Sequence, residues 1–194
     1  MTRVVLSIGS NLGDRLEHLR GVVRALGPRL IAVSSVYSTP PWGGVPQQDY
    51  LNAVLVARDP ELEPSDWLRL GQDLERAADR VREVRWGART LDVDIVWAAQ
   101  SRGAGETVCR SADPTLTLPH PQAHNRAFVL TPWAEVEPWA TLEVVAGAPR
   151  PIRELLTELS ADEVRGVRRT ELSLGWEPAN RGWEPVNRGW EPMR

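Results

Sequence analysis

The alternation of hydrophobic and polar positions in the N-terminal half of the chain predicts a regular series of strands and helices. Segments that alternate every second residue are the expected strands, and segments with apolar residues every third or fourth position are the expected helices. Glycines and prolines separate them. The predicted elements follow the order strand, helix, strand, strand, helix, strand, over residues 3–8, 14–26, 30–37, 50–57, 63–81 and 90–97.

This βαββαβ order is that of a ferredoxin-like fold in the α+β class. It predicts an antiparallel sheet with the helices on one face, which leaves the other face free to carry a site. Alternate residues from Tyr50 to Val56 share one face of their strand. The proline-rich segment 39–46 and the polar segment 101–114 are expected to be loops at the rims of the site. Short helical pieces are predicted at 119–121 and 128–133, a strand at 141–145 and a helix at 151–159.

The composition describes a chain with one hydrophobic core and no basic surface. Of the 194 residues, 42% are hydrophobic, and single domains commonly contain about 100–200 residues. The formal charge of -3 argues against nucleic acid as a partner. The N-terminus has no signal-peptide pattern, and no apolar run reaches the about 18 residues of a membrane span. We therefore expect a cytoplasmic monomer that acts on small molecules, with no membrane partner.

Arginine and cysteine usage narrows the chemistry further. All 23 basic residues are arginine, and arginine contacts phosphate through a forked, permanently charged group. A GC-rich genome would produce the same bias at surface positions. The single cysteine, Cys109, leaves no disulfide within the chain and no cysteine-based zinc site. The three histidines show no regular ligand spacing for zinc.

The C-terminal segment is a short repeat. Gly-Trp-Glu-Pro begins at residues 175, 182 and 189. Proline in each unit excludes a heptad coil, and the repeats are too few for a solenoid. We therefore divide the chain into a folded domain over residues 1–172 and a poorly ordered tail over 173–194. A docking peptide that uses its tryptophans is the alternative.

Two carboxylates in an apolar strand are the first candidates for chemistry. Asp92 and Asp94 project from the same face of the strand because side chains alternate, and their neighbours Val93 and Ile95 indicate burial. Paired carboxylates repel each other unless a cation lies between them. Mg²⁺ takes one or two carboxylates and completes its coordination with water and phosphate oxygens. The pair therefore predicts a magnesium site.

Arginines and one histidine supply the complementary half of a phosphate site. Arg80, Arg82, Arg85 and Arg89 come just before the two acids, and arginine suits forked contacts with phosphate. His120 lies between two prolines, which fix its backbone and favour a positioned donor. Acids for a metal and arginines for phosphate oxygens are the parts of a nucleotide phosphate site.

A flat heterocycle is the ligand that the remaining candidates fit. Tyr50 offers a ring face, and Asn52 offers both a donor and an acceptor. They follow the proline-rich segment that begins at Thr39. From these residues alone, a packed tyrosine and a turn asparagine are the favoured interpretation.

Taken together, these motifs resemble the 6-hydroxymethyl-7,8-dihydropterin pyrophosphokinase family, over residues 3 to 138. The run from Arg85 to Ile95, followed by Leu-Pro-His, is the most specific part of the resemblance. The other landmarks appear in the family's order: 9–12, 39–41, 49–52, 80–82, 118–120, 125–126 and 128. The family usually has proline where this chain has Ala88, and the segment between Arg82 and Trp86 is a residue short. These departures concern ATP affinity rather than the reaction.

The resemblance implies roles for individual residues. Asp92 and Asp94 are expected to bind two Mg²⁺ ions. The catalytic group comprises Arg82, Arg89, Asp94 and His120. Contacts to ATP are expected from Gln72, Glu75, Arg82, Trp86, Arg89, Ile95, His120 and Arg126. Contacts to the pterin are expected from Thr39, Pro40, Trp42, Tyr50, Asn52, Asp92 and Phe128.

The implied activity moves the terminal diphosphate of ATP onto the hydroxymethyl group of the pterin and releases AMP, a step of folate synthesis. A nucleotidyltransferase also carries Gly-Ser and Asp-x-Asp, but there the two motifs are close in sequence. Here Gly9 and Asp92 are separated by several elements, so that interpretation fails. The alternative outside enzymology is a pterin- or nucleotide-binding module without activity. The repeats leave a third alternative, an interaction protein built on a vestigial enzyme body.

Overall fold

The structure is a computed structural model, and it describes residues 1–41, 47–78, 89–103, 105–144 and 147–178. The strands of this part are β1 (Thr2–Ser10), β2 (Leu30–Val33), β3 (Tyr37–Thr39), β4 (Tyr50–Asp59), β5 (Asp92–Arg102), β6 (Gly105–Val108), β7 (Ser111–Asp113), β8 (Leu116–Leu118), β9 (Thr141–Glu143), β10 (Pro149–Pro151) and β11 (Arg168–Arg169). The helices are α1 (Arg15–Leu26), α2 (Pro64–Ala77), α3 (Ala127–Val136), α4 (Ile152–Glu158) and α5 (Ala161–Gly166), with short 3₁₀ turns η1 (Gly27–Arg29) and η2 (Ala123–Asn125).

An antiparallel sheet organises the molecule. Among the described residues, its strands follow the order β11-β3-β4-β1-β5-β6, and β2 also pairs with β4. β1 lies between β4 and β5 and is antiparallel to both. It occupies the centre because its residues are apolar on both faces, and Val4 and Val5 are both fully buried. The predicted α+β class with an antiparallel sheet is confirmed.

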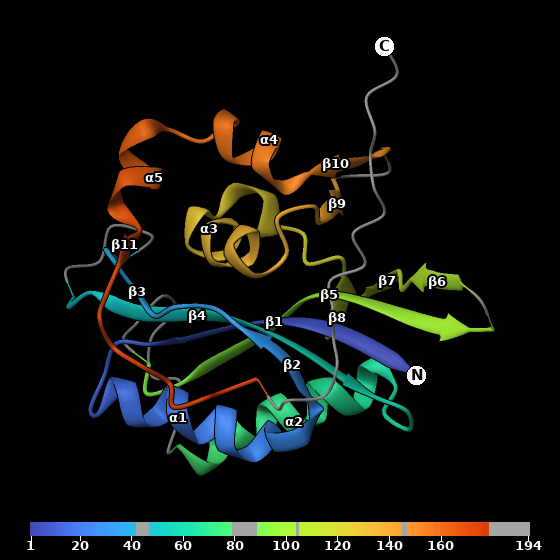
Figure 1. The fold of residues 1–194 in the computed structure, drawn as a ribbon, viewed down its shortest axis with the longest axis horizontal. Coiled ribbons are helices and arrows are strands. Elements are labelled where there is room, and N and C mark those ends of the chain that lie inside the picture. The colour runs from blue at the N-terminus through green and yellow to red at the C-terminus, as the bar shows by residue number, and fades with distance from the viewer. Residues whose placement is uncertain (42–46, 79–88, 104, 145–146, 179–194) are drawn as a thin grey trace.

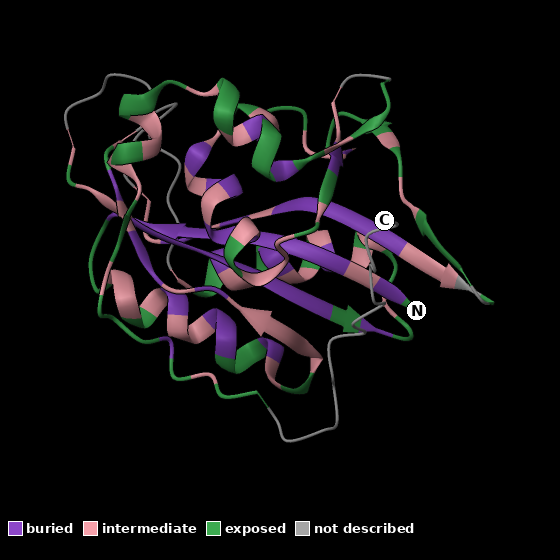
Figure 2. Ribbon diagram, turned by 45° about the horizontal axis from the view of Figure 1, so that its top comes forward, coloured by how far each residue is buried: buried purple, intermediate pink, exposed green. Residues whose placement is uncertain are grey.

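Helices cover both faces of this sheet (Figure 1). α1 and α2 lie on one face, where Leu19 and Trp67 join a core with alternate strand residues. α3, α4 and α5 lie on the other face, where Leu130 and Trp133 belong to a second core. Figure 2 shows the buried strands between the two layers. Helices on one face alone were predicted. The C-terminal helices instead cover part of the second face.

The starts of the two long helices follow from local capping chemistry. The Asp14 side chain accepts a hydrogen bond from the Glu17 backbone N–H at 3.1 Å, which satisfies a donor that a helix start leaves free. α2 begins with a capping box between Glu63 and Asp66. α1 ends at Gly27, whose φ of 49° favours glycine. No helix in the described part of the chain is long and apolar enough to cross a membrane.

Two predicted segments differ from the structure. The expected strand over 30–37 is divided, because the Ser34 hydroxyl accepts the Val54 backbone N–H at 2.9 Å and interrupts the ladder between β2 and β3. The expected loop over 101–114 contains the end of β5 together with β6 and β7. Its polar residues are typical of a loop, yet Thr107 pairs with Gln100. An exposed edge strand can be polar on both faces, so the hydrophobic pattern missed it.

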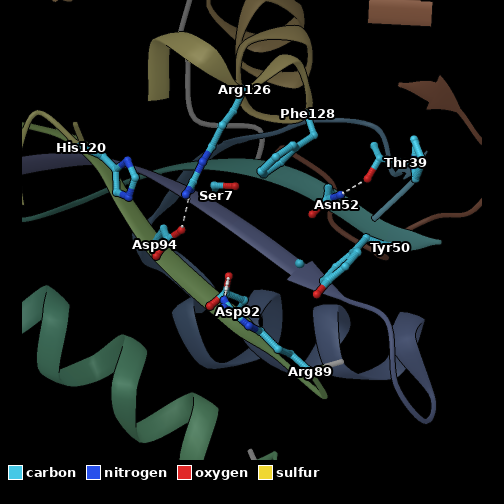
Figure 3. A pocket seen from close by; sticks show the side chains of 12 residues that line it. Ser7, Thr39, Tyr50, Asn52, Arg89, Asp92, Asp94, His120, Arg126 and Phe128 are labelled. Atoms are coloured by element: carbon cyan, nitrogen blue, oxygen red, sulfur yellow. Dashed lines mark hydrogen bonds and ion pairs between the residues drawn. The ribbon is translucent and has the colours of Figure 1, made fainter. Parts of the chain in front are cut away.

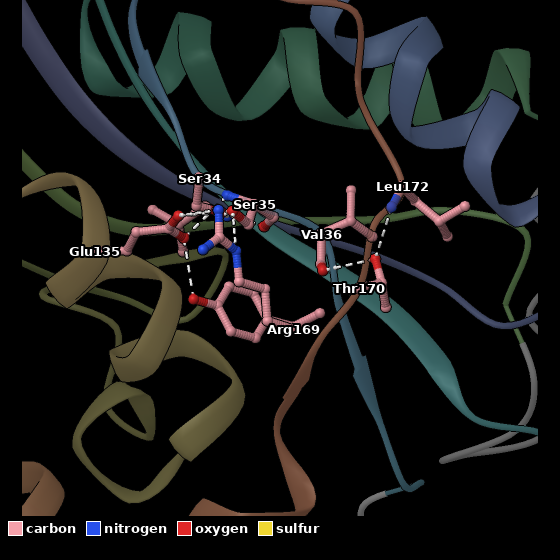
Figure 4. Close-up of polar contacts among 9 residues, drawn as sticks. Ser34, Ser35, Val36, Glu135, Arg169, Thr170 and Leu172 are labelled. Atoms are coloured by element: carbon pink, nitrogen blue, oxygen red, sulfur yellow. Dashed lines mark hydrogen bonds and ion pairs between the residues drawn. The ribbon is translucent and has the colours of Figure 1, made fainter.

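The segment after α5 forms a strap along the edge of the sheet (Figure 4). Thr170 donates its backbone N–H and its hydroxyl to the Val36 carbonyl, both at 2.9 Å. Farther along, Leu174 is 7% exposed and belongs to the core under α1. Trp176 packs against the same core. The first residues assigned to the tail, 173–178, therefore lie against the folded body, and residues 179–194 fall outside the described part.

A polar cluster joins this edge to α3 (Figure 4). The Glu135 carboxylate accepts hydrogen bonds from the Ser35 backbone N–H at 2.9 Å and from the Tyr37 hydroxyl at 3.0 Å. Arg169 donates to the Ser35 hydroxyl at 2.8 Å. Burial, followed by the charge of Glu135, raises the pKa of Tyr37 to about 12. The cluster fixes β3 against α3, and both elements lead into the site described next.

Candidate active site

The floor of the candidate site is a row of residues across three neighbouring strands. In the sheet register, Gly9 of β1 pairs with Asn52 of β4 on one side and with Asp92 of β5 on the other. Beside this row, Ser7 pairs with Asp94. These residues border a cavity of about 250 Å³ on the α3 side of the sheet (Figure 3). It is lined by Ser7, Gly9, Thr39, Pro40, Tyr50, Asn52, Arg89, Asp92, Asp94, His120, Arg126 and Phe128.

One side of the cavity is neutral and tightly arranged. Asn52 Nδ2 donates a hydrogen bond of 2.6 Å to Thr39 Oγ1, and the two residues are only 4% and 2% exposed. Because one of the two Nδ2 N–H groups is committed to Thr39, the amide orientation of Asn52 is fixed. The rings of Tyr50 and Phe128 lie on either side of Asn52 in Figure 3. This half offers two aromatic faces and a fixed amide edge.

Gly9 separates the neutral side from the charged side. A Cβ atom added at this position would lie 2.5 Å from Asn52 Oδ1, which is well inside van der Waals contact. Glycine is therefore required here by the close approach of the neighbouring side chain. The missing side chain also opens the floor between Asn52 and Asp92.

The other side of the cavity holds two ion pairs (Figure 3). Arg89 Nη1 lies 2.6 Å from Asp92 Oδ2, and Arg126 Nη1 lies 3.3 Å from Asp94 Oδ2. The predicted alternation is confirmed, since both carboxylates face the cavity while Val93 and Ile95 enter the core under α2. The Arg126 guanidinium also lies 5.7 Å from the centre of the Phe128 ring. Arg126 thus bridges the charged and the aromatic parts of the site.

The electrostatics of the charged side follow from burial and crowding. Burial and the charge of Asp92 raise the pKa of Asp94 to about 6, against the opposing effect of Arg126 and Arg89. Burial alone would lower the pKa of Arg89, but the charge and hydrogen bond of Asp92, together with the charges of Tyr50 and Asp94, outweigh it and the pKa is raised. Two carboxylates are thus held together at a cost that a bound cation would relieve.

His120 is held as a neutral imidazole beside the acids. Its backbone N–H donates to the Val96 carbonyl at 2.9 Å, which ties the residue to β5. Burial, followed by the charge of Arg126, lowers the pKa of His120 to about 4. The Gln122 backbone N–H donates to His120 Nδ1 at 3.2 Å. A neutral ring that accepts at Nδ1 carries its proton on Nε2, so His120 is a donor without charge.

Comparison with known proteins identifies the family. The sequence model of 7,8-dihydro-6-hydroxymethylpterin-pyrophosphokinase (HPPK) matches residues 5–138. A 2-amino-4-hydroxy-6-hydroxymethyldihydropteridine pyrophosphokinase of Mycobacterium tuberculosis is 56% identical over 169 residues, which cover 87% of this chain and 89% of that protein. The chain belongs to the HPPK family.

Further comparisons agree with this assignment. The pyrophosphokinase of the same name from Mycobacterium leprae is 52% identical over 176 residues, which cover 90% of this chain and 92% of that protein. A crystal structure of Plasmodium falciparum HPPK-DHPS matches with a TM-score of 0.55 at 13% identity, over 81% of this chain and 44% of that one. At that identity the structural match shows the fold alone.

Most HPPK site residues predicted from the sequence meet in the cavity, and some do not. Gln72 and Glu75 lie on α2, behind β5, and Ile95 is buried in the core on that side. Glu75 Oε1 accepts the Val93 backbone N–H at 2.9 Å, so it supports the strand that carries the acids. Their contacts to ATP stay predictions. Trp42, Arg82 and Trp86 lie outside the described residues.

Two lining residues had no predicted role. Ser7 and Gly9 share a face of β1 with the row across the sheet. Ser7 is a polar residue in a mostly apolar central strand. That polar position is the sequence feature that could have predicted its place in the cavity. Gly9 belongs to the family's first landmark, but its fit against Asn52 depends on strand register, which the sequence pattern does not specify.

Proposed function

We propose that the cavity performs the family's reaction, in which the terminal diphosphate of ATP moves to the hydroxymethyl group of 6-hydroxymethyl-7,8-dihydropterin and AMP is released, as a step of folate biosynthesis. The observation that supports it best is the division of one cavity into a neutral aromatic half and a charged half, with Gly9 between them. A flat heterocycle fits the first half and a polyphosphate fits the second.

The neutral half is assigned to the pterin. Tyr50 and Phe128 contact the two faces of the heterocycle, and the fixed Asn52 amide recognises its edge. Thr39 holds that amide in place, and Pro40 forms part of the cavity wall beside it. Trp42 is a further pterin contact in this proposal. The pterin's hydroxymethyl group then points past Gly9, toward the two carboxylates.

The charged half is assigned to ATP. Arg89 and Arg126 are already oriented into the cavity by their ion pairs, and each guanidinium has further donors for phosphate oxygens. His120 adds a neutral donor from β5. Arg82, Trp86, Gln72, Glu75 and Ile95 complete the nucleotide contacts in this proposal.

Asp92 and Asp94 are the residues that fit magnesium. Their oxygens are the hard ligands that Mg²⁺ prefers, and the raised pKa of Asp94 reflects first its burial and then the charge of the neighbouring Asp92. Within the described residues, no group of three or more His, Cys, Asp and Glu side chains is arranged to hold a metal. Two Mg²⁺ ions would therefore rely on phosphate oxygens and water, and they would neutralise charge on the polyphosphate.

Catalysis by this chain is mainly positioning. The pterin hydroxyl oxygen attacks the β-phosphorus of ATP, the bond from that phosphorus to the α-β bridging oxygen breaks, and AMP leaves with that oxygen. The neutral half holds the nucleophile in line, and the arginines and His120 neutralise charge on the transferring group. The proton of the hydroxyl goes to solvent or to a nearby acceptor, and Asp94 is not assigned that role.

Measurement of AMP tests the proposal. ATP with Mg²⁺ is expected to yield AMP only when 6-hydroxymethyl-7,8-dihydropterin is present. ADP as the product would indicate ordinary phosphoryl transfer instead. Tight binding of both ligands without turnover would favour the binding-module alternative. A chain deleted from residue 179 onward is expected to keep its activity, and loss of activity would favour a function for the repeats.

Other features of the chain are proposals of the same kind. The β1 to β5 segment, read as strand, helix, strand, strand, helix, strand, fits the ferredoxin-like arrangement, with the β2 and β3 pieces as one interrupted strand. We place the protein in the cytoplasm as a monomer. The packing of Leu174 moves the proposed boundary of the folded domain from 172 to about 178, and the repeats beyond it stay assigned to a poorly ordered tail.

A further inference from the structure

Asn11, just after β1, is a fully buried asparagine that the reaction described above does not use. Every polar group of this residue has a partner. Its backbone N–H donates to the Arg89 carbonyl at 3.0 Å, and its Oδ1 accepts from the Arg89 backbone N–H at 2.7 Å. Its Nδ2 donates to Gln47 Oε1 at 2.9 Å and to the Gln48 carbonyl at 3.3 Å. The Gln48 side chain donates back to the Asn11 carbonyl.

These partners belong to two segments on opposite sides of the cavity. Arg89 pairs with Asp92 in the charged half. Gln47 and Gln48 lie three and two residues before Tyr50, which forms a wall of the neutral half. Arg15 of α1 fixes the same segment, since its Nη1 donates to the Asp49 carbonyl at 2.7 Å. Asn11 is thus a bridge between the backbone that carries Arg89 and the backbone that carries Tyr50.

We propose that Asn11 is a positioning residue that couples the two substrates, so that ATP bound at Arg89 strengthens binding of the pterin at Tyr50, and the reverse. This inference rests on the proposed function of the two halves. A buried amide with all its donors and acceptors in use cannot lose one partner without leaving a polar group unsatisfied, which is unfavourable. A displacement of either segment is therefore resisted by the other, and a ligand that fixes one segment helps to fix both. Such coupling must be reciprocal.

Two variants separate the bridge from the binding groups. Asn11→Asp keeps the oxygen that accepts from Arg89 and removes the two donors to Gln47 and Gln48. Gln48→Ala removes one bond from an exposed residue that does not line the cavity, so it is expected to fold. Gln100→Ala, at the far end of β5, is the matched truncation outside the site.

The measurement is a double titration of the full chain. The Kd of 6-hydroxymethyl-7,8-dihydropterin is determined with and without Mg²⁺ and α,β-methylene ATP, in which the scissile P–O bond is replaced, and the nucleotide is titrated in the same way. The ratio of the two Kd values is the coupling factor. On the scale of one or two hydrogen bonds, we expect it to fall about tenfold in Asn11→Asp and about threefold in Gln48→Ala. Single-ligand Kd values should stay within about twofold, and Gln100→Ala should match the native chain.

The outcomes are distinguishable. A coupling factor near one in the native chain, or an unchanged factor in both variants, overturns the role of Asn11. Loss of single-ligand affinity in parallel with coupling would show a structural role only, and also overturns it. If Asn11→Asp does not fold, the result for Gln48→Ala decides. Failure of the native chain to bind either ligand would instead refute the proposed function.

Discussion

The two halves of the cavity lie on different strands on either side of β1, with β3 and β4 under the neutral half and β5 under the charged half, and they are stabilised in opposite ways. In the neutral half, a single buried hydrogen bond between Asn52 and Thr39 fixes the geometry. In the charged half, Arg89 and Arg126 are satisfied by Asp92 and Asp94. A ligand entering the neutral half finds its partners already placed. One entering the charged half must take over groups that are paired with each other.

This difference indicates which interactions make each half selective for its ligand. Preorganised neutral groups reject a wrong ligand because a buried polar atom would be left unpaired. The charged half can adapt, because its arginines have donors to spare and its acids tolerate a cation. Variants of the charged half should therefore reduce the rate, whereas variants of the neutral half should reduce pterin affinity.

The largest effect is expected for the two acids. Asp92→Asn and Asp94→Asn each remove a proposed metal ligand while keeping the size of the side chain, and the rate of AMP formation should fall by about a hundredfold to a thousandfold. The control is Asp162→Asn, an exposed acid on α5. Pterin affinity without nucleotide should be retained. A fall in that affinity as large as the fall in rate would contradict the division into halves.

Asp94→Asn should also change the pH dependence of stability in metal-free protein. The folded pKa of Asp94 is raised from 3.8 to about 6, so folding favours the protonated form. Its contribution is complete below about pH 4 and is lost as the pH rises through about 6. Denaturant unfolding with EDTA should show this loss in the native chain and less of it in the variant.

A smaller effect is expected where β1 meets the neutral half. In Gly9→Ala the new methyl group would lie 2.5 Å from Asn52 Oδ1, and overpacking of this kind costs about 1–3 kcal/mol. If Asn52 moves to make room, pterin Kd should rise by about fivefold to a hundredfold. The control is Gly105→Ala, where nothing lies within 4 Å of an added Cβ. Nucleotide binding should be nearly unchanged, and an equal loss for both ligands would argue against two separate halves.

Two conservative substitutions at Thr39 test whether its hydrogen bond to Asn52 supports pterin binding. Thr39→Val leaves Asn52 Nδ2 buried without its acceptor, and such an orphaned group costs about 1–3 kcal/mol. Thr39→Ser keeps the hydroxyl and is expected to restore most of the pterin affinity that Thr39→Val loses. Isothermal titration with the pterin alone compares the two. Equal affinities in both variants would mean that the hydrogen bond does not orient Asn52.

The smallest effect is expected beyond the cavity, at the cluster that supports β3. Tyr37 has its pKa raised from 10.0 to about 12, so its contribution to stability is complete below pH 10 and is lost as the pH rises to about 12. Because the chain has no lysine and only two tyrosines, few other side chains titrate between pH 10 and 12. Tyr37→Phe should flatten the decline in denaturant midpoint between pH 10 and 12, with Tyr50→Phe as the control. An unchanged decline would exclude Tyr37 as its source.

The sequence predicted the floor of the site because strands repeat every second residue. The shared face of Asp92 and Asp94, and the face from Tyr50 to Val56, followed from that period alone. Which residue lies opposite which depends on register, which is set by packing across the sheet. The contact between Gly9 and Asn52 could therefore not be predicted.

The strands that the sequence pattern did not predict were missed for a different reason. β6 and β11 are held at the sheet edges mainly by main-chain pairing and carry polar, exposed residues, so hydrophobic period gave no signal for them. Residues 173–178 were assigned to the tail because the Gly-Trp-Glu-Pro repeat begins at residue 175, yet Leu174, just before the repeat, is buried in the core and Trp176, within it, packs against that core.

The tight contact between Gly9 and Asn52 has a consequence for inhibitors and for resistance to them. A compound that lies over Gly9 and binds the Asn52 amide would touch positions with little freedom to mutate. A larger residue at position 9 strikes Asn52, and loss of the Thr39 hydroxyl or of the Asn52 amide leaves a buried polar atom unpaired. With the pterin bound here as proposed, substitutions that weaken the compound would weaken the natural pterin as well, so escape by mutation would reduce the activity of the enzyme.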